Sequence, residues 1–81
     1  MNITFHKSVL MIARRNLGLH IQEMLKNTTK MQDVVSEFEC FTVEQGCLIV
    51  WYKVHTLTDV CFHGTRFVNA NTIETVIRTE V

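Results

Sequence analysis

The chain has 81 residues, of which 47% are hydrophobic and 20% are charged, and its formal net charge at pH 7 is zero. This length and composition indicate one small domain over residues 1–81 and exclude disorder of the chain as a whole. No apolar run approaches the roughly 20 residues that span a bilayer, so we expect no membrane segment.

The charges are unevenly distributed along the chain. Residues 1–32 hold five basic side chains and one acidic side chain, whereas residues 33–81 hold three basic and seven acidic ones. A basic N-terminal third beside an acidic remainder does not favour nonspecific binding of nucleic acid by the whole surface. It favours self-association of opposite faces, or contact with an acidic partner.

Residues 6–30 have the periodicity of an amphipathic helix, with apolar residues at spacings of three and four and basic or polar residues opposite. The apolar stripe consists of Leu10, Ala13, Leu17, Ile21 and Met24, with Val9, His20 and Leu25 at its edges and Arg15, Gln22 and Lys26 opposite. Before this segment, residues 1–5 alternate weakly and could add a short strand to a sheet edge. Thr4 or Ser8 could cap the helix.

Two features of the helical segment depart from a simple amphipathic pattern. Gly18 lies within it, where glycine costs about 1 kcal/mol relative to alanine. It either divides the segment into two helices or allows another backbone to come close. Met11, Ile12 and Leu19 fall on the basic side, which leaves an ordinary surface or a second contact surface open.

The segment from residue 30 to residue 38 is ambiguous. Met31, Val34, Val35 and Phe38 have helical spacing, but the residues from Val34 onward are rich in β-branched and aromatic side chains. We expect a short helical turn near Met31 that passes into a strand by about Glu37.

A β-hairpin is predicted around Gly46, with arms over residues 37–43 and 47–57. A three-residue loop, Glu44 to Gly46, would pair Val43 with Cys47, Phe41 with Ile49 and Glu37 with Lys53. This register places Phe38, Cys40, Leu48, Val50, Tyr52 and Val54 on one face, and Cys40 and Cys47 on opposite faces. We favour this register over that of a two-residue loop because it keeps the apolar residues of both arms on the same face.

Residues 60–68 read as a third strand, with Gly64 as a possible bulge, and Asn69 to Asn71 form a turn. Residues 72–81 have two interpretations, a short helix or a strand. A hairpin through Ala70 would pair Arg66 with Glu74, Thr65 with Thr75 and Phe67 with Ile73, and propensity favours the strand. The predicted fold is therefore α+β, one long N-terminal helix packed on an antiparallel three- or four-stranded sheet.

The second face of the hairpin carries apolar residues that the helix cannot cover, because a helix covers one face only. They are Phe41, Ile49 and Trp51, which are either covered by the C-terminal segment or exposed for a partner. A tryptophan flanked by charges is typical of interface anchors. We predict a partner-binding surface that consists of Phe41, Ile49 and Trp51 on the sheet, and Arg15, Leu19 and Lys26 on the helix.

The sequence offers little support for catalysis or for a metal. The candidate ligands Cys40, Cys47, His55, Cys61 and His63 lack the paired spacings of structural zinc sites. There is no glycine-rich phosphate loop and no nucleophile-elbow pattern. Three cysteines without a signal sequence predict reduced thiols in a cytoplasmic setting. We therefore expect no enzyme activity, no cofactor and no metal.

The leading functional hypothesis is a small, non-enzymatic protein-interaction module. Its composition resembles that of phage or viral accessory proteins that inhibit or redirect a host protein, and it could also form a homodimer. The alternative is a small nucleic-acid-binding regulator that uses Arg14, Arg15 and Lys26 along the N-terminal helix. The acidic remainder of the chain argues against that alternative.

Overall fold

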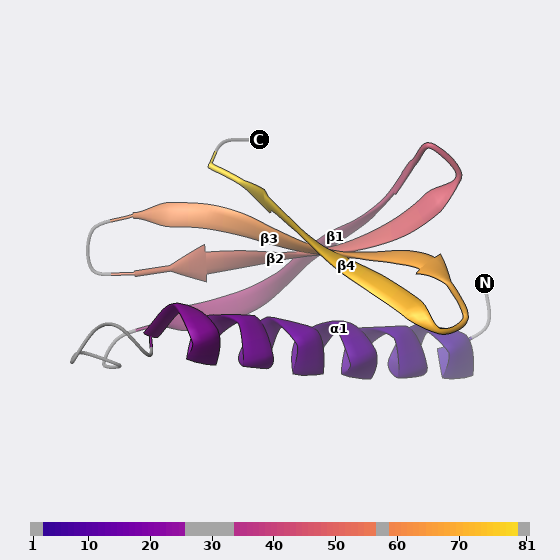
Figure 1. The fold of residues 1–81 in the computed structure, drawn as a ribbon, viewed down its shortest axis with the longest axis horizontal. Helices are drawn as coiled ribbons and strands as arrows, with labels where there is room; N and C mark the ends of the chain where they lie inside the picture. Colours follow the sequence, from indigo (N-terminus) through magenta and orange to yellow (C-terminus); the bar gives the residue numbers. More distant parts are fainter. Residues whose placement is uncertain (1–2, 26–33, 57–58, 80–81) are drawn as a thin grey trace.

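The computed structural model describes residues 3–25, 34–56 and 59–79, with side chains from residue 7 to residue 23 in the first range. Within these ranges it has one helix, α1 (Ile3–Leu25), and four strands, β1 (Val35–Glu44), β2 (Cys47–His55), β3 (Val60–Asn69) and β4 (Thr72–Arg78). The strands form one antiparallel sheet in the order β1-β2-β3-β4. The helix runs along one face of this strongly twisted sheet (Figure 1), which confirms the predicted α+β fold.

The helix is longer at its N-terminus than predicted and is not divided. It begins at Ile3, so the expected strand over residues 1–5 is wrong, and Thr4 and Ser8 lie inside the helix rather than at its cap. It passes through Gly18 without interruption, and a Cβ atom at Gly18 would meet nothing within 4 Å. The helix end predicted near residues 27–29 and the helical turn predicted near Met31 lie outside the described residues.

The core lies between the helix and the two central strands. Val9, Ala13 and Leu17 are buried against Val50, Tyr52 and Val54 of β2. Leu10 and Ile21 are partly buried beside this cluster. The predicted apolar stripe of the helix is therefore confirmed, except for Met24, whose side chain lies outside the described residues.

Side-chain hydrogen bonds fix the helix on the sheet at two places. The Tyr52 hydroxyl of β2 donates to the carbonyl of Leu10 at 3.2 Å. On the other side of the helix, Asn16 Nδ2 lies 3.1 Å from both Thr65 Oγ1 of β3 and Thr75 Oγ1 of β4. Because these bonds join α1 to three different strands, they fix its position across the sheet.

The β1–β2 hairpin differs from the predicted register. Gln45 and Gly46 form a two-residue turn, and both have positive φ, 53° and 75°, as a type I′ turn requires. Val43 therefore pairs with Leu48, not with Cys47, and Phe41 pairs with Val50. The register shifts between Phe38 and Cys40, and this β-bulge restores the predicted pair of Glu37 with Lys53. β1 begins at Val35, two residues before the predicted start.

The second half of the sheet follows the sequence closely. β4 is a strand, and its pairs with β3 include Arg66 with Glu74, Thr65 with Thr75 and Phe67 with Ile73, all as predicted. The expected bulge at Gly64 is wrong, because Gly64 pairs regularly with Trp51 and with Val76. The irregularity in β3 lies instead between Phe67 and Asn69.

Candidate functional site

The helix covers only part of its side of the sheet. It packs against β2, β3 and β4, and within the described residues its backbone lies farther from β1 than from these three strands. A helix about 10 Å wide covers roughly two strands that are spaced about 4.8 Å apart. The helix-side face of the edge strand β1 is therefore without a covering element among the described residues.

A groove lies where this uncovered strand meets the helix. Its volume is about 340 Å³, and we call it the α1–β1 groove. Its lining residues come from α1, β1 and β2: Leu10, Met11, Arg14, Ser36, Phe38 and Tyr52. Met11 is 64% exposed and Phe38 is 44% exposed, so two large apolar side chains of the groove are open to solvent.

The bulge in β1 concentrates aromatic side chains beside this groove. Residues three apart on a regular strand lie on opposite faces, but the bulge turns Phe38 and Phe41 to the same side. Their ring centroids are 5.1 Å apart, and Phe38 meets the Tyr52 ring edge-on at 6.1 Å. The prediction that Phe41 shares a face with Ile49 and Trp51 is therefore wrong, because Phe41 packs on the helix-side core.

Arg14 is the charged side chain among the residues that line the groove. It is exposed, and no ion pair joins it to a carboxylate within the described part of the chain. Burial raises the pKa of Tyr52, whereas the positive charge of Arg14 acts in the opposite direction. The groove thus combines an apolar floor with one unpaired positive charge at its wall.

The opposite face of the sheet is closed by the protein itself. Ile49 is 0% exposed and Trp51 is 4% exposed, although the helix that the structure describes packs on the opposite face of β2. Trp51 lies against Gly64 of β3, where a Cβ atom would come within 2.8 Å of Ile49 and 2.9 Å of the Trp51 ring. A glycine at this position is therefore required for the two large side chains to pack flat on the sheet.

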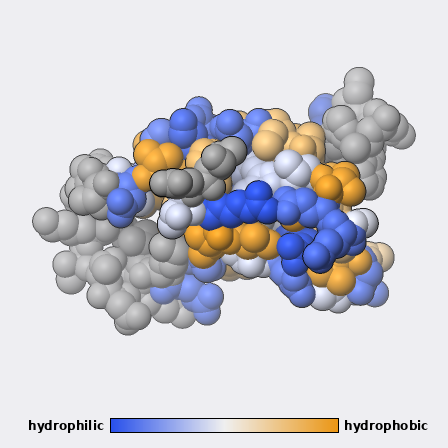
Figure 2. All heavy atoms as spheres, turned by 90° about the horizontal axis from the view of Figure 1, so that it is seen from above, coloured by the Kyte–Doolittle hydropathy of each residue, from blue (hydrophilic) through white to orange (hydrophobic). Residues whose placement is uncertain are grey.

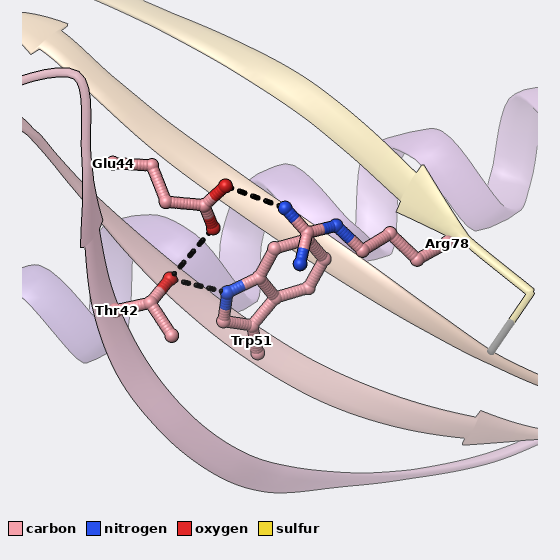
Figure 3. A network of polar contacts seen from close by, with 4 residues as sticks. All are labelled: Thr42, Glu44, Trp51 and Arg78. Carbon is pink, nitrogen blue, oxygen red and sulfur yellow. Dashed lines mark hydrogen bonds and ion pairs between the residues drawn. The ribbon is translucent and has the colours of Figure 1, made fainter. Parts of the chain in front are cut away.

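A polar network closes over Trp51 (Figure 3). The indole Nε1–H donates to Thr42 Oγ1 at 2.6 Å, and the Thr42 hydroxyl donates to Glu44 at 3.2 Å. Arg78, at the end of β4, reaches back to Glu44 at 2.5 Å, and its guanidinium lies 4.6 Å from the centre of the Trp51 ring. The two edge strands of the sheet are thereby joined across its face.

Polar side chains lie across the middle of this face. A band of hydrophilic atoms crosses the middle of the face away from the helix, with hydrophobic atoms on both sides of it (Figure 2). Arg66 and Glu74 form a second ion pair there, at 3.5 Å. Ile49 and Trp51 are therefore not an exposed surface, and the C-terminal strand, the other possibility raised by the sequence, covers them.

The helix residues predicted for partner binding are at the surface where the structure describes them. Arg15 and Leu19 are exposed on α1, Leu19 by 60%. Leu19 lines a second depression of about 420 Å³ between α1 and β4 with Asn16, His20, Gln22, Glu23 and Thr75. Lys26 lies outside the described residues. The basic set proposed for nucleic acid is thus reduced to Arg14 and Arg15 in the described part.

Two histidines meet under the helix. The ring centroids of His20 of α1 and His63 of β3 are 5.0 Å apart, and His63 is buried. His20 Nε2 and His63 Nδ1 are buried without a hydrogen-bond partner in the described part. Burial, and secondarily the neighbouring His20, lower the pKa of His63. The lowered pKa favours the neutral imidazole of His63 in the folded protein.

The remaining candidate ligands do not assemble into a metal site. Within the described residues, no group of three His, Cys, Asp or Glu side chains is placed to hold a metal ion. Cys40, Cys47 and Cys61 are free thiols. Cys40 and Cys47 pair with Trp51 and Glu44 and thus share the far face, which corrects the prediction of opposite faces. Burial raises the pKa of the Cys61 thiol, which disfavours its thiolate.

Comparison with protein-family models, with characterised proteins and with solved structures finds no match for this chain. No helix in the described residues is long and apolar enough to cross a membrane. The candidate site therefore rests on its own geometry.

The sequence places Phe38 and Tyr52 on the apolar helix-side face, but does not identify them as a site. The signal that could have revealed the groove is that one predicted helix is too narrow to cover a sheet of four strands.

Proposed function

We propose that this protein is a non-enzymatic interaction module that binds another protein through the α1–β1 groove. The observation that carries the proposal is the uncovered face of β1, where Phe38 and Met11 stay exposed beside a helix that packs elsewhere. Exposed apolar residues that adjoin one another are typical of interaction sites. Arg15 and Leu19 are exposed on the same helix but do not line the groove, and we propose them as secondary contacts only.

We also infer finer aspects of the function, which rest on the chemistry of the groove and on the composition of the chain. A shallow apolar groove with one charged residue suits binding rather than catalysis, because catalysis needs positioned acid, base or nucleophilic groups. The role we infer is that of an accessory protein, of the phage or viral kind, that inhibits or redirects a host protein. Three free thiols fit a reducing compartment such as the cytoplasm.

Affinity capture with paired variants tests the proposal. The variant Phe38→Glu places a charge in the groove. Val60→Glu places the same charge on the other face of the sheet, at a valine that is 43% exposed, close to the 44% of Phe38. Wild type and Val60→Glu should retain the same proteins from a lysate of the source cells. Phe38→Glu should lose them while its circular dichroism spectrum stays unchanged.

Two results would contradict this function. One is retention of the same proteins by Phe38→Glu and wild type. The other is a common loss in Phe38→Glu and Val60→Glu, which would place the binding surface elsewhere or make it depend on net charge alone.

A further inference from the structure

We propose that the α1–β1 groove receives an amphipathic helix of the partner protein, packed beside α1 over β1, with a carboxylate of that helix facing Arg14. This inference rests on the proposed function and specifies the partner's chemistry. It names both the secondary structure and the charge of the segment that binds.

The shape of the groove favours a helix. One wall is α1 and the floor is β1 with its neighbour β2, so the space is that of a second helix in the same layer. Neighbouring helices pack with their axes about 8–10 Å apart, which is roughly the width of two strands. Met11 on the wall and Phe38 on the floor would both contact the apolar stripe of such a helix.

The charge of the groove favours an acidic helix. Arg14 is the charged lining residue and has no carboxylate partner in the described part of the chain. Glu37 pairs in register with Lys53 and belongs to the other face of the sheet, so it does not neutralise Arg14. The described side chains of α1 include Lys7, Arg14 and Arg15 but only one acidic residue, Glu23. A carboxylate opposite Arg14 would gain a charge-assisted hydrogen bond.

The same charge argues against the helix of a second copy as the occupant. Two α1 helices side by side would bring Arg14 and Arg15 of each copy toward those of the other. Like charges across an interface disfavour association. A helix from another protein has no such restriction.

The test is a selection from a displayed library of 18-residue amphipathic helices with a fixed leucine stripe and randomised flanking positions. The targets are the full-length wild type, Arg14→Glu, Phe38→Glu and the control Lys53→Glu, whose residue is on the far face. Against wild type and Lys53→Glu, we expect one flanking position to be enriched in Asp or Glu. Against Arg14→Glu, that position should change to Lys or Arg.

Binding of a selected peptide should weaken at least tenfold in Arg14→Glu and be restored when the peptide's acidic residue is changed to lysine. Enrichment without a charge preference at any position, or equal binding by wild type and Arg14→Glu, would overturn the acidic helix. A dimer of the chain alone in light scattering that Phe38→Glu dissociates would assign the groove to a second copy. Binding of a random-sequence oligonucleotide that Arg14→Glu abolishes, without any peptide enrichment, would assign it to nucleic acid.

These failures differ from failure of the proposed function. If lysate proteins depend on Phe38 but selected helices show no acidic preference, the groove binds a protein and only its assigned partner chemistry is wrong. If neither lysate proteins nor peptides distinguish Phe38→Glu from Val60→Glu, the groove is not a binding site and both proposals are overturned.

Discussion

The two faces of the sheet are both apolar at their centres but are covered in different ways. On one face, α1 lies over β2, β3 and β4 and leaves the edge strand β1 partly open. On the other face, the described residues include no helix, yet Trp51 is 4% exposed because Arg78 and the side chains around it close over the ring. The face with a helix therefore has the larger apolar opening.

This difference shows that the number of covering elements does not decide which face keeps large apolar side chains open to solvent. The sheet is strongly twisted (Figure 1), and a long side chain of one edge strand, Arg78, reaches Glu44 of the other edge strand. A single helix on a four-stranded sheet leaves space at one side because it is too narrow. Four predictions test this contrast, from the largest expected effect to the smallest.

Truncation of Trp51 should have the largest effect, because its ring fills the closed face. We expect Trp51→Ala to lower the free energy of unfolding by about 3–5 kcal/mol, as for other buried aromatic residues. Urea titration followed by circular dichroism measures the loss. The control, Val60→Ala, removes a half-exposed side chain on the same face and should change stability by less than about 1 kcal/mol. Equal losses in the two variants would contradict a sealed Trp51.

The close approach of Gly64 to Trp51 gives the second prediction. A Cβ atom at this position would lie 2.8 Å from Ile49 and 2.9 Å from the Trp51 ring, so both side chains would have to shift. Gly64→Ala should destabilise the protein by about 1–3 kcal/mol. Gly18→Ala is the matched control, because its new Cβ atom meets nothing and the helix gains propensity. Gly18→Ala should raise the free energy of unfolding by up to about 1 kcal/mol. Urea titration should therefore show changes of opposite sign in the two variants.

The histidine pair under the helix predicts a pH dependence on the other side of the sheet. Because the pKa of His63 is lowered in the folded protein, the unfolded chain takes up a proton at a higher pH than the folded chain does. Stability should therefore fall as the pH decreases below about 6.5, the usual value for histidine. Thermal melts between pH 7.5 and 5 should show this fall in wild type and in His55→Gln. In His63→Phe, we expect stability to fall less over the same pH range. A fall as large as that of wild type would exclude His63 as the cause of the pH dependence.

The smallest expected effect on stability is that of Arg78. Its ion pair with Glu44 is partly exposed, and such pairs contribute at most about 1 kcal/mol, as do exposed cation–π contacts. Arg78→Ala should therefore lower the free energy of unfolding by about 1 kcal/mol. It should also increase the quenching by acrylamide of the fluorescence of Trp51, the single tryptophan. Arg15→Ala, an exposed arginine of the helix, should leave quenching unchanged. Equal quenching in wild type and Arg78→Ala would show that Arg78 does not cover the ring.

Much of the fold is predictable because its local signals agree with one another. The helical periodicity identifies the core stripe around Ala13 and Leu17, and propensity with cross-strand pairing identifies β4. The Gln45–Gly46 turn is not predictable in the same way, because glutamine rarely adopts positive φ. The bulge after Phe38 has no signal either, because nothing in the local sequence requires an extra residue there.

The candidate site is less predictable, because burial depends on the whole sheet. Ile49 and Trp51 fall on a predicted face that also carries Glu37, Glu39 and Lys53, so their burial is not evident from the sequence, whereas in the structure Arg78 lies over the Trp51 ring. Phe41 changes faces because the two-residue turn pairs it with Val50, and the bulge then returns Phe38 to the same side. Phe38 and Met11 become a site only through the lateral position of α1, which is fixed by distant bonds such as that from Tyr52 to Leu10. None of these features has a signal within a few residues of sequence.

Solvent accessibility of both faces, measured together in solution, tests the contrast most directly. A soluble gadolinium reagent broadens the NMR signals of exposed protons, so that one titration compares the Met11 methyl and the Phe38 ring with the Ile49 methyls and the Trp51 indole. The structure predicts strong broadening for Met11 and Phe38 and protection of Ile49 and Trp51. Protection of Met11 and Phe38 together with broadening of Trp51 would contradict this account. Such a result would favour the far face of the sheet as the proposed interaction surface.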